Sequence, residues 1–301
     1  MSVLICGSLA FDTITTFGGR FAEQILPDQV HILNVSFLVP TLKREYGGCA
    51  GNIAYSLHQL GGKPVVMATL GEDGQPYVQR MRDWGITLDH VQTVPDSYTA
   101  QAIIITDQSN NQITAFHPGA MMQAHIQRIE ANPAIKLAIV APDGRDAMIQ
   151  HAEQLVAAGI PFVFDPGQGL PMFDGADLMR FVEQATWVAV NDYEAKMLVE
   201  RTGKSLAELS KNNLKGLIET LGADGCRVWV DGEAIHVSGV KAAAVVDPTG
   251  CGDAFRGGLL YGLSQGWDLV RSVTLGNQIG AIKIAAAGPQ NYTLDRAALG
   301  V

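Results

Sequence analysis

Short apolar segments alternate with amphipathic segments along most of this chain, and this alternation constrains the fold more than any other feature. Apolar runs at 64–70, 137–141, 161–165 and 186–190 have the length and composition of buried strands, and an earlier one at 3–6 ends in a Gly-Ser turn. Strands that alternate with helices form parallel sheets covered on both faces. The sequence therefore predicts an α/β fold with a doubly wound, mostly parallel central sheet flanked by helices, with ligands at the carboxyl ends of the strands.

Helices are predicted where apolar residues recur at helical spacing. The expected helices cover residues 50–60, 74–84, 145–158 and 193–201, and two longer ones begin near 251 and 268. An apolar run at 217–221 precedes a hairpin around Asp231-Gly232.

Two stretches, at about 12–46 and 90–117, interrupt the alternation. The first holds short apolar pieces without helical period, at Thr13–Phe17, Val30–Leu33 and Ser36–Val39. The second holds a hairpin pattern, with strands at 102–106 and 112–116 around an Asp-Gln-Ser-Asn-Asn turn. We expect the two insertions to pair into one small β-sheet, a lid with segments at about 13–46 and 96–118 of a single domain spanning 1–301.

Composition narrows the classes of function. Apolar residues make up 47% of the 301 residues and charged residues 17%, which is typical of a globular enzyme. The net charge of −9 argues against a general nucleic-acid or acidic-membrane surface, because those need clustered Lys and Arg. The four cysteines have no zinc or disulfide spacing, and no signal peptide or membrane-length apolar run is present. We therefore expect a cytoplasmic protein.

The segment 247–253, Asp-Pro-Thr-Gly-Cys-Gly-Asp, carries the strongest chemical signal. Gly250 and Gly252 let the backbone turn with its amides outward, and the apolar spacing after Asp253 indicates that a helix begins there. A helix N-terminus with free N–H groups attracts anions, so this segment could receive a phosphoryl group next to a carboxylate. The alternative is an ordinary helix cap with glycine turn residues.

Polar residues also follow the first predicted strand and open the first predicted helix. Asp12 can accept hydrogen bonds from vicinal hydroxyls of a sugar, or it can be a solvated turn residue. Gly47 and Gly48 would let a flat ligand approach the backbone, and Asn52 offers a donor and an acceptor to hydroxyls. These three residues could equally form a flexible turn and a helix start.

Two further motifs stand at predicted strand ends. Asn191 and Glu194 lie three apart at a helix start, where they could hold water around Mg²⁺ or form a simple capping box. The run from Thr220 through Gly222 to Gly225 could contact phosphate or close a hairpin. The P-loop, dinucleotide-binding and protein-kinase motifs are absent from the sequence.

In their order along the chain these motifs resemble the ribokinase (PfkB) family of sugar and nucleoside kinases. The resemblance rests on Gly7-x4-Asp12, Gly47-Gly48-x3-Asn52, Asp165-Pro166, Asn191-x2-Glu194, Thr220-x-Gly222-x2-Gly225 and the 247–253 segment, and it covers essentially the whole chain. Cys251 departs from the small Ala or Gly usual in the family. Segments 7–12, 44–52 and 115–120 look most like prokaryotic adenosine and nucleoside kinases.

The resemblance implies transfer of the γ-phosphoryl group of ATP, with Mg²⁺, to the 5′ hydroxyl of a nucleoside, adenosine being the expected acceptor. It makes Asp253 the base and the amides of Gly250, Cys251 and Gly252 the anion hole. It assigns the acceptor to Asp12, Gly47, Gly48, Asn52 and Phe116, and the nucleotide to Asn191, Glu194, Thr220, Gly222, Gly225 and Asn277. Asn191 and Glu194 would organise Mg²⁺, while Asp247 and Thr249 could hold a monovalent cation such as K⁺.

Three functions remain open at this point. A kinase of a free sugar such as ribose or fructose would share the catalytic residues and differ in the lid. A catalytically silent binding protein would not need Asp253. Phe17, Phe37 or Phe116 could stack on a base, although each could instead belong to the core of the lid. The expected partners are ATP and a small acceptor, and the chain could be a monomer or a homodimer joined through the lid.

Overall fold

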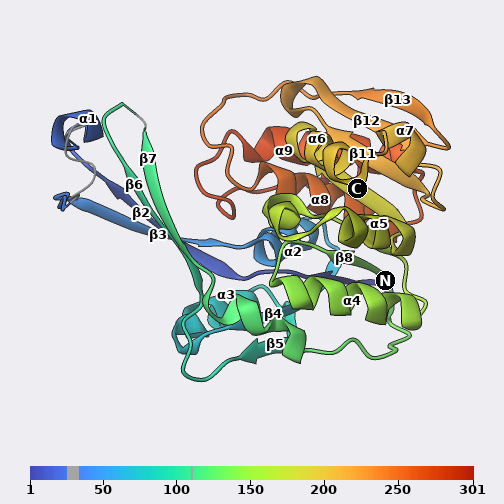
Figure 1. The fold of residues 1–301 in the computed structure, drawn as a ribbon, viewed down its shortest axis with the longest axis horizontal. Helices are drawn as coiled ribbons and strands as arrows, with labels where there is room; N and C mark the ends of the chain where they lie inside the picture. Colours follow the sequence, from blue (N-terminus) through green and yellow to red (C-terminus); the bar gives the residue numbers. More distant parts are fainter. Residues whose placement is uncertain (26–33, 110) are drawn as a thin grey trace.

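The computed structural model describes residues 1–25, 34–109 and 111–301, and nine strands form a large sheet within them (Figure 1). The strands are β1 (Ser2–Cys6), β4 (Lys63–Leu70), β5 (Thr87–Thr93), β8 (Ile135–Val140), β9 (Phe162–Phe164), β10 (Trp187–Asn191), β11 (Gly216–Thr220), β12 (Gly225–Val230) and β13 (Glu233–Ser238). Their order is β13-β12-β11-β10-β9-β8-β1-β4-β5. All neighbours are parallel except the β11-β12 and β12-β13 pairs, so the expected doubly wound, mostly parallel sheet is confirmed.

Helices cover both faces of this sheet. One layer contains α2 (Cys49–Gln59), α3 (Gln75–Asp83), α8 (Cys251–Ser264) and α9 (Leu269–Lys283). The other contains α4 (Arg145–Ala157), α5 (Gly175–Gln184), α6 (Asp192–Thr202) and the short α7 (Leu206–Leu209). The short α10 (Arg296–Leu299) closes the chain. None of the described helices is long and apolar enough to cross a membrane.

The central strand β1 shows how the sequence builds two cores. Side chains alternate across a strand, so Val3 and Ile5 pack among α2 and α8, while Leu4 and Cys6 pack on the α4 and α5 side. All four are buried. Both faces of β1 are therefore apolar, as a central parallel strand requires.

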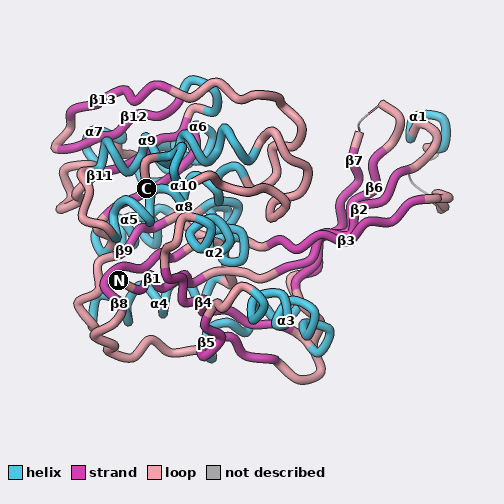
Figure 2. Tube along the Cα trace, turned by 180° about the vertical axis from the view of Figure 1, so that it is seen from behind, coloured by secondary structure: helices cyan, strands magenta, loops and turns pink. Residues whose placement is uncertain are grey.

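A second sheet of four strands projects from the body (Figure 2). It consists of β2 (Ala10–Thr16), β3 (Thr41–Gly47), β6 (Ala100–Thr106) and β7 (Gln112–His117), in the order β3-β2-β6-β7, with the short α1 (Phe21–Gln24) near its far end. Parallel pairing of β2 with β6 joins the two insertions, so the small sheet expected from the sequence is present.

The structure corrects several predicted elements. Residues 36–39 form no strand, and the predicted piece Val30–Leu33 lies entirely within residues 26–33, outside the described chain. Residues 87–93, assigned in part to the second insertion, form β5 at the edge of the large sheet, because they pair in parallel with β4. Which sheet a strand joins depends on the strand it pairs with, and the local sequence pattern does not reveal that partner.

Glycines allow α8 and α9 to pack closely. A Cβ added to Gly258 would lie 2.9 Å from Cα and N of Gly276. This backbone contact leaves no room for a methyl group. In contrast, a Cβ on Gly280 of the same helix pair would meet nothing nearer than the carbonyl oxygen of Cys251 at 3.7 Å.

We predict that Gly258→Ala lowers the free energy of unfolding by about 1–3 kcal/mol, because overpacking at a backbone contact exceeds the gain in helix propensity. Gly280→Ala is the matched control and should raise it by about 0.5–1 kcal/mol through helix propensity alone. Urea unfolding followed by circular dichroism measures both. Equal effects of the two substitutions would contradict the close helix contact.

Candidate active site

A cavity of about 890 Å³ lies where the carboxyl ends of the large sheet meet the small sheet. Strand ends supply Asp165, Asn191 and Thr220, and the small sheet supplies Asp12 and Phe116. A volume of this size is within the usual range for small-molecule sites, and its position is the one that open α/β sheets use for ligands.

The N-terminus of α8 forms one wall. Gly250 precedes the helix with φ 77°, a left-handed conformation that favours glycine, and a Cβ there would lie 2.7 Å from Cβ of Pro289. Within the described chain, the wall includes Gly250 and Gly252 but not Cys251, whose amide donates a hydrogen bond of 3.1 Å to the Pro248 carbonyl. The expected anion hole is therefore better served by the amides of Gly250 and Gly252 than by that of Cys251.

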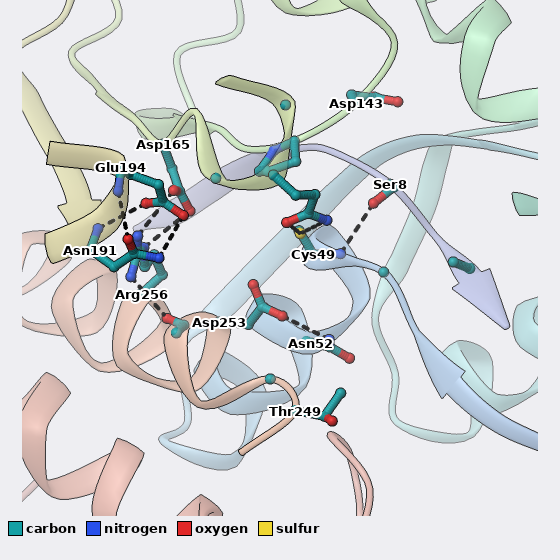
Figure 3. A pocket seen from close by; sticks show the side chains of 18 of the residues that line it. Ser8, Cys49, Asn52, Asp143, Asp165, Asn191, Glu194, Thr249, Asp253 and Arg256 are labelled. Carbon is teal, nitrogen blue, oxygen red and sulfur yellow. Dashed lines mark hydrogen bonds and ion pairs between the residues drawn. The ribbon is translucent and has the colours of Figure 1, made fainter. Parts of the chain in front are cut away.

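Asp253 lies in the first turn of α8 and faces the cavity (Figure 3). Its Oδ2 accepts a hydrogen bond of 2.8 Å from Nδ2 of Asn52. Burial raises the pKa of Asp253 to about 6, with Asp165 adding to the rise, while Asn52 and Arg256 oppose it. A carboxylate with such a pKa is ionised at neutral pH and still accepts a proton readily, as a general base must.

A chain of side chains holds Asn52 in place. Oδ1 of Asn52 accepts a hydrogen bond of 2.9 Å from Nε2 of Gln290, which also donates to the Tyr77 hydroxyl at 2.7 Å. Tyr77 in turn donates to the carbonyl of Gly47 at 2.7 Å. This network fixes the amide so that its NH₂ group points at Asp253. Asn52 was expected to contact the acceptor; the structure shows that it also orients the base.

Arg256 and Asp165 form a buried ion pair beside Asp253. The guanidinium donates two hydrogen bonds of 3.0 Å, from Nε to Oδ2 and from Nη2 to Oδ1. The side chains are only 5% and 4% exposed. Sequence reasoning missed Arg256, since an arginine within an otherwise apolar helix pattern gives no local sign of its partner, 91 positions earlier.

Asp12 and the Gly47-Gly48 pair meet as the sequence predicts. Asp12 lies on β2 and faces the cavity, and a Cβ on Gly47 would come within 2.7 Å of its Oδ2. Gly48 has φ 84°, and a Cβ there would lie 2.6 Å from the backbone of Ala10 and Ser8. Burial raises the pKa of Asp12 to about 6, and the nearby Glu45 contributes. Glycine at position 47 leaves the carboxylate accessible, whereas glycine at position 48 is required by its positive φ and by the neighbouring backbone.

Asn191 and Glu194 form the capping box that was one of the two alternatives for this motif. They form a capping box, with Oδ1 of Asn191 accepting from the Glu194 amide and Oε2 of Glu194 accepting from the Asn191 amide, both at 2.8 Å. Both residues also line the cavity, close to Asp165 and Arg256 (Figure 3). Burial raises the pKa of Glu194, with Asp165 adding to the rise.

No group of three or more His, Cys, Asp or Glu residues in the described chain is arranged to hold a metal ion. A magnesium ion at Glu194 would therefore take most of its ligands from water and phosphate, which is the usual arrangement for this ion. The side-chain oxygens of Asn191 and Glu194 each accept one hydrogen bond within the capping box, and their remaining lone pairs could accept hydrogen bonds from the water around such an ion.

The predicted nucleotide residues divide into two groups. Thr220 and Gly222 line the cavity. Gly225, with φ 94°, lies in the expected hairpin between β11 and β12, where a Cβ would meet the Val237 carbonyl at 2.2 Å, and it is not among the described lining residues. Asn277 also lies outside that lining, and its Nδ2 donates to the Ser238 carbonyl at 3.2 Å. Both have structural roles in this conformation.

Of the three phenylalanines considered for base stacking, one lines the cavity and two do not. Phe116 lines the cavity and is 56% exposed. Phe17 and Phe37 pack with Phe21 at ring-centroid distances of 5.0 to 5.9 Å, and neither belongs to the described lining. The structure thus supports the core alternative for these two and leaves Phe116 as the candidate for base stacking.

Two further cavity residues escaped sequence reasoning. Asp143 is buried, its Oδ2 has no hydrogen-bond partner in the described chain, and burial raises its pKa to about 8. It therefore carries a proton at neutral pH and can donate a hydrogen bond into the cavity. Gln168 lies on the short 3-10 helix Gly167–Met172 after Asp165, in a glycine-rich loop that has no periodic signal.

Comparison with known proteins agrees with this geometry. Residues 21–296 match the pfkB family of carbohydrate kinases. The nucleoside kinase of Methanocaldococcus jannaschii is 27% identical over 262 residues, which cover 85% of each chain. The structure of Burkholderia thailandensis nucleoside kinase in complex with inosine is 53% identical, with a TM-score of 0.88 over 99% of this chain and 95% of that one. The structure of the same kinase in complex with ADP-inosine is 55% identical, with a TM-score of 0.85 over 99% of this chain and 93% of that one.

This chain belongs to the pfkB family of carbohydrate kinases. It is accordingly a phosphotransferase that acts on an alcohol group, and the resemblance drawn from its motifs is confirmed.

The pKa of Asp253 predicts the acidic limb of the pH profile. Because the base form exists above its pKa, kcat/KM for the acceptor should fall tenfold per pH unit below about pH 6. Asn52→Ala removes the hydrogen bond that lowers this pKa, so it should move the limb to higher pH. Burial also raises the pKa of Asp12 to about 6, so the fall would steepen to as much as about 100-fold per pH unit if the ionisation of Asp12 is required as well. Asn52 donates its hydrogen bond to Asp253 and not to Asp12.

Initial rates between pH 4.5 and 9, with ATP saturating, measure the acidic limb of the wild type and that of Asn52→Ala. A limb that stays at the same pH in Asn52→Ala would assign it to Asp12 or another group rather than to Asp253.

Proposed function

We propose that this chain is an ATP-dependent nucleoside kinase that transfers the γ-phosphoryl group to the 5′ hydroxyl, with adenosine as the expected acceptor. The observation that carries the proposal is the 53–55% identity, over 99% of the chain, to a nucleoside kinase whose structures include complexes with inosine and with ADP-inosine. The inosine in those complexes supports a purine nucleoside, and adenosine is our extension of it.

The residues of the cavity supply each part of the reaction. Asp253 accepts the proton of the 5′ hydroxyl as its oxygen attacks the γ-phosphorus, and the bond from that phosphorus to the bridging oxygen of ADP breaks. The amides of Gly250 and Gly252, at the positive end of the α8 dipole, stabilise the charge on the transferred group. Mg²⁺, held through water by Asn191 and Glu194, would neutralise charge on the phosphates. Thr220 and Gly222 would border the nucleotide.

Further residues of the cavity wall favour a nucleoside over a free sugar. They include the apolar side chains of Phe116, Met121 and Met172 together with the polar groups of Asp143 and Gln168. A flat base needs an apolar surface for its faces and polar partners for its edges, whereas ribose or fructose would leave this part of the cavity filled with water. The small sheet, which carries Phe116, would act as the lid that excludes water from the reaction.

The proposal also includes a cytoplasmic location and, as one alternative for the assembly, a homodimer. The four cysteines are free thiols, three of them buried, which supports a reducing cytoplasmic setting. Apolar side chains on the small sheet are exposed, Leu42 by 69% and Ile103 by 43%. This surface supports the alternative of a homodimer joined through the small sheet.

Replacing the base tests the mechanism. Asp253→Asn should lower kcat by roughly 10²- to 10⁴-fold with little change in the KM of ATP or acceptor, the usual contribution of a positioned general base. Steady-state ADP release measures this. Asp89→Asn, an exposed carboxylate on β5, is the matched control and should retain full activity. Near-normal turnover in Asp253→Asn would remove Asp253 from the mechanism.

An acceptor panel tests the substrate class. Stacking on Phe116 should contribute about 1–3 kcal/mol, so adenosine and inosine should exceed ribose and fructose in kcat/KM by roughly 10-fold or more. Phe116→Ala should lower the nucleoside values and leave ribose unchanged. Ile113→Ala, on the same strand but outside the described cavity lining, is the control. Equal or better use of ribose or fructose would leave a sugar kinase as the function.

A further inference from the structure

Lys283, the last residue of α9, is a fully buried lysine with three oxygen neighbours. Its Nζ donates hydrogen bonds to the carbonyl of Asp247 at 2.7 Å and to the carbonyl of Ala286 at 3.1 Å, and it lies 3.8 Å from Oδ2 of Asp247. Lysine is almost never fully buried unless it is paired. Removing an ammonium group from water is energetically unfavourable, so its burial here indicates a specific structural or functional role.

The ammonium group lies at the start of the loop that forms the anion hole. Val246 and Asp247 donate their amides to the carbonyl of Ile284, at 2.8 and 3.1 Å, and so tie the loop to the end of α9. Oδ1 of Asp247 accepts from the amide of Thr249 at 2.9 Å, and Oδ2 accepts from the amide of Gly288 at 2.7 Å. Lys283 therefore joins three segments, the end of α9, the turn after it and the loop that leads into α8.

These oxygen atoms are the ligands expected of a monovalent cation. Two carbonyls and a carboxylate form a negative cluster, and the C-terminus of α9 adds the negative end of a helix dipole. Hydrogen bonds from Thr249 and Gly288, against the effect of burial, lower the pKa of Asp247, so its carboxylate is ionised at neutral pH. Potassium and a primary ammonium group have the same charge and similar radii, so one can replace the other among such oxygens.

The cation expected at Asp247 and Thr249 does not fit beside Lys283. Both carboxylate oxygens of Asp247 already accept hydrogen bonds, and its carbonyl binds the ammonium group. A second positive charge next to Nζ would be repelled by the ammonium group, and little solvent is present there to screen the repulsion. Thr249 faces the cavity, whereas Asp247 is not among the described lining residues.

We propose that the ammonium group of Lys283 is a built-in cation of the anion-hole loop and makes the enzyme independent of monovalent cations. Lys283 is a positioning residue, since it acts through the backbone of Asp247. By binding that carbonyl it holds the loop so that the amides of Gly250 and Gly252 point into the cavity. The activity test rests on the proposed kinase function, whereas the thermal test below does not.

The wild-type enzyme provides the first test. With tetramethylammonium as the reference salt at constant ionic strength, kcat should stay within about twofold when K⁺, Na⁺ or NH₄⁺ replaces it, because the loop already holds its cation. Its melting temperature should likewise not depend on which cation is present, since a cation that binds the native state would raise it. Stimulation of wild-type kcat by tenfold or more in K⁺ would overturn the proposal, even if no variant folds.

Lys283→Met provides the second test, because it removes the charge and keeps the length of the side chain. In tetramethylammonium its kcat should fall by about 10- to 100-fold with little change in the acceptor KM, as a displaced anion hole predicts. K⁺ should restore part of the rate and raise the melting temperature, a response that a merely structural role would not produce. Lys136→Met, an exposed lysine on β8, is the matched control.

Wild-type turnover by Lys283→Met in tetramethylammonium would overturn the proposal. If the wild-type chain phosphorylates no acceptor, the proposed function fails, but the comparison of melting temperatures still decides the role of Lys283. Cation-independent melting of the wild type together with K⁺-dependent melting of Lys283→Met would support it.

Discussion

The buried ion pair between Arg256 and Asp165 determines where the N-terminus of α8 lies, and the rest of the site depends on that position. Arg256 is one turn after Asp253, and Asp165 stands at the end of β9, so the pair ties the catalytic helix to the central sheet. Buried pairs contribute little net stability compared with apolar packing, yet breaking one costs about 3–5 kcal/mol. Such a pair defines a position more than it stabilises the fold.

Four carboxylates in and beside the site each have a defined partner. Asp253 is held by Asn52, Asp165 by Arg256, Glu194 by the amide of Asn191, and Asp247 by Lys283. Burial raises the pKa of Asp253 and Glu194, which are partly open to the cavity. Carboxylates arranged in this way can receive a proton and a hydrated cation, while the two buried bases, Arg256 and Lys283, hold the surrounding backbone.

Several local motifs in this protein have a structural role and also lie at the cavity wall. Asn191 and Glu194 cap α6 as any capping box does, and the same caps stand at the edge of the cavity because α6 starts where β10 ends. Gly48 and Gly250 adopt left-handed conformations as turn glycines, and both also line the cavity. The interpretation of these residues as caps and turns is therefore compatible with a catalytic or binding role. In a parallel sheet the chain turns at the carboxyl ends of the strands, and ligands bind there too.

The sequence by itself determined the alternation of strands and helices, the two insertions and the motifs around Asp12, Asn52 and Asp253, because each depends on residues close together in the chain. Only the tertiary structure decided that 87–93 joins the large sheet, that Phe17 packs away from the cavity and that Cys251 does not line it. It alone brought Lys283 to Asp247 and Arg256 to Asp165. Such contacts join residues 36 and 91 positions apart, and no local pattern records which distant side chain will neutralise a buried charge.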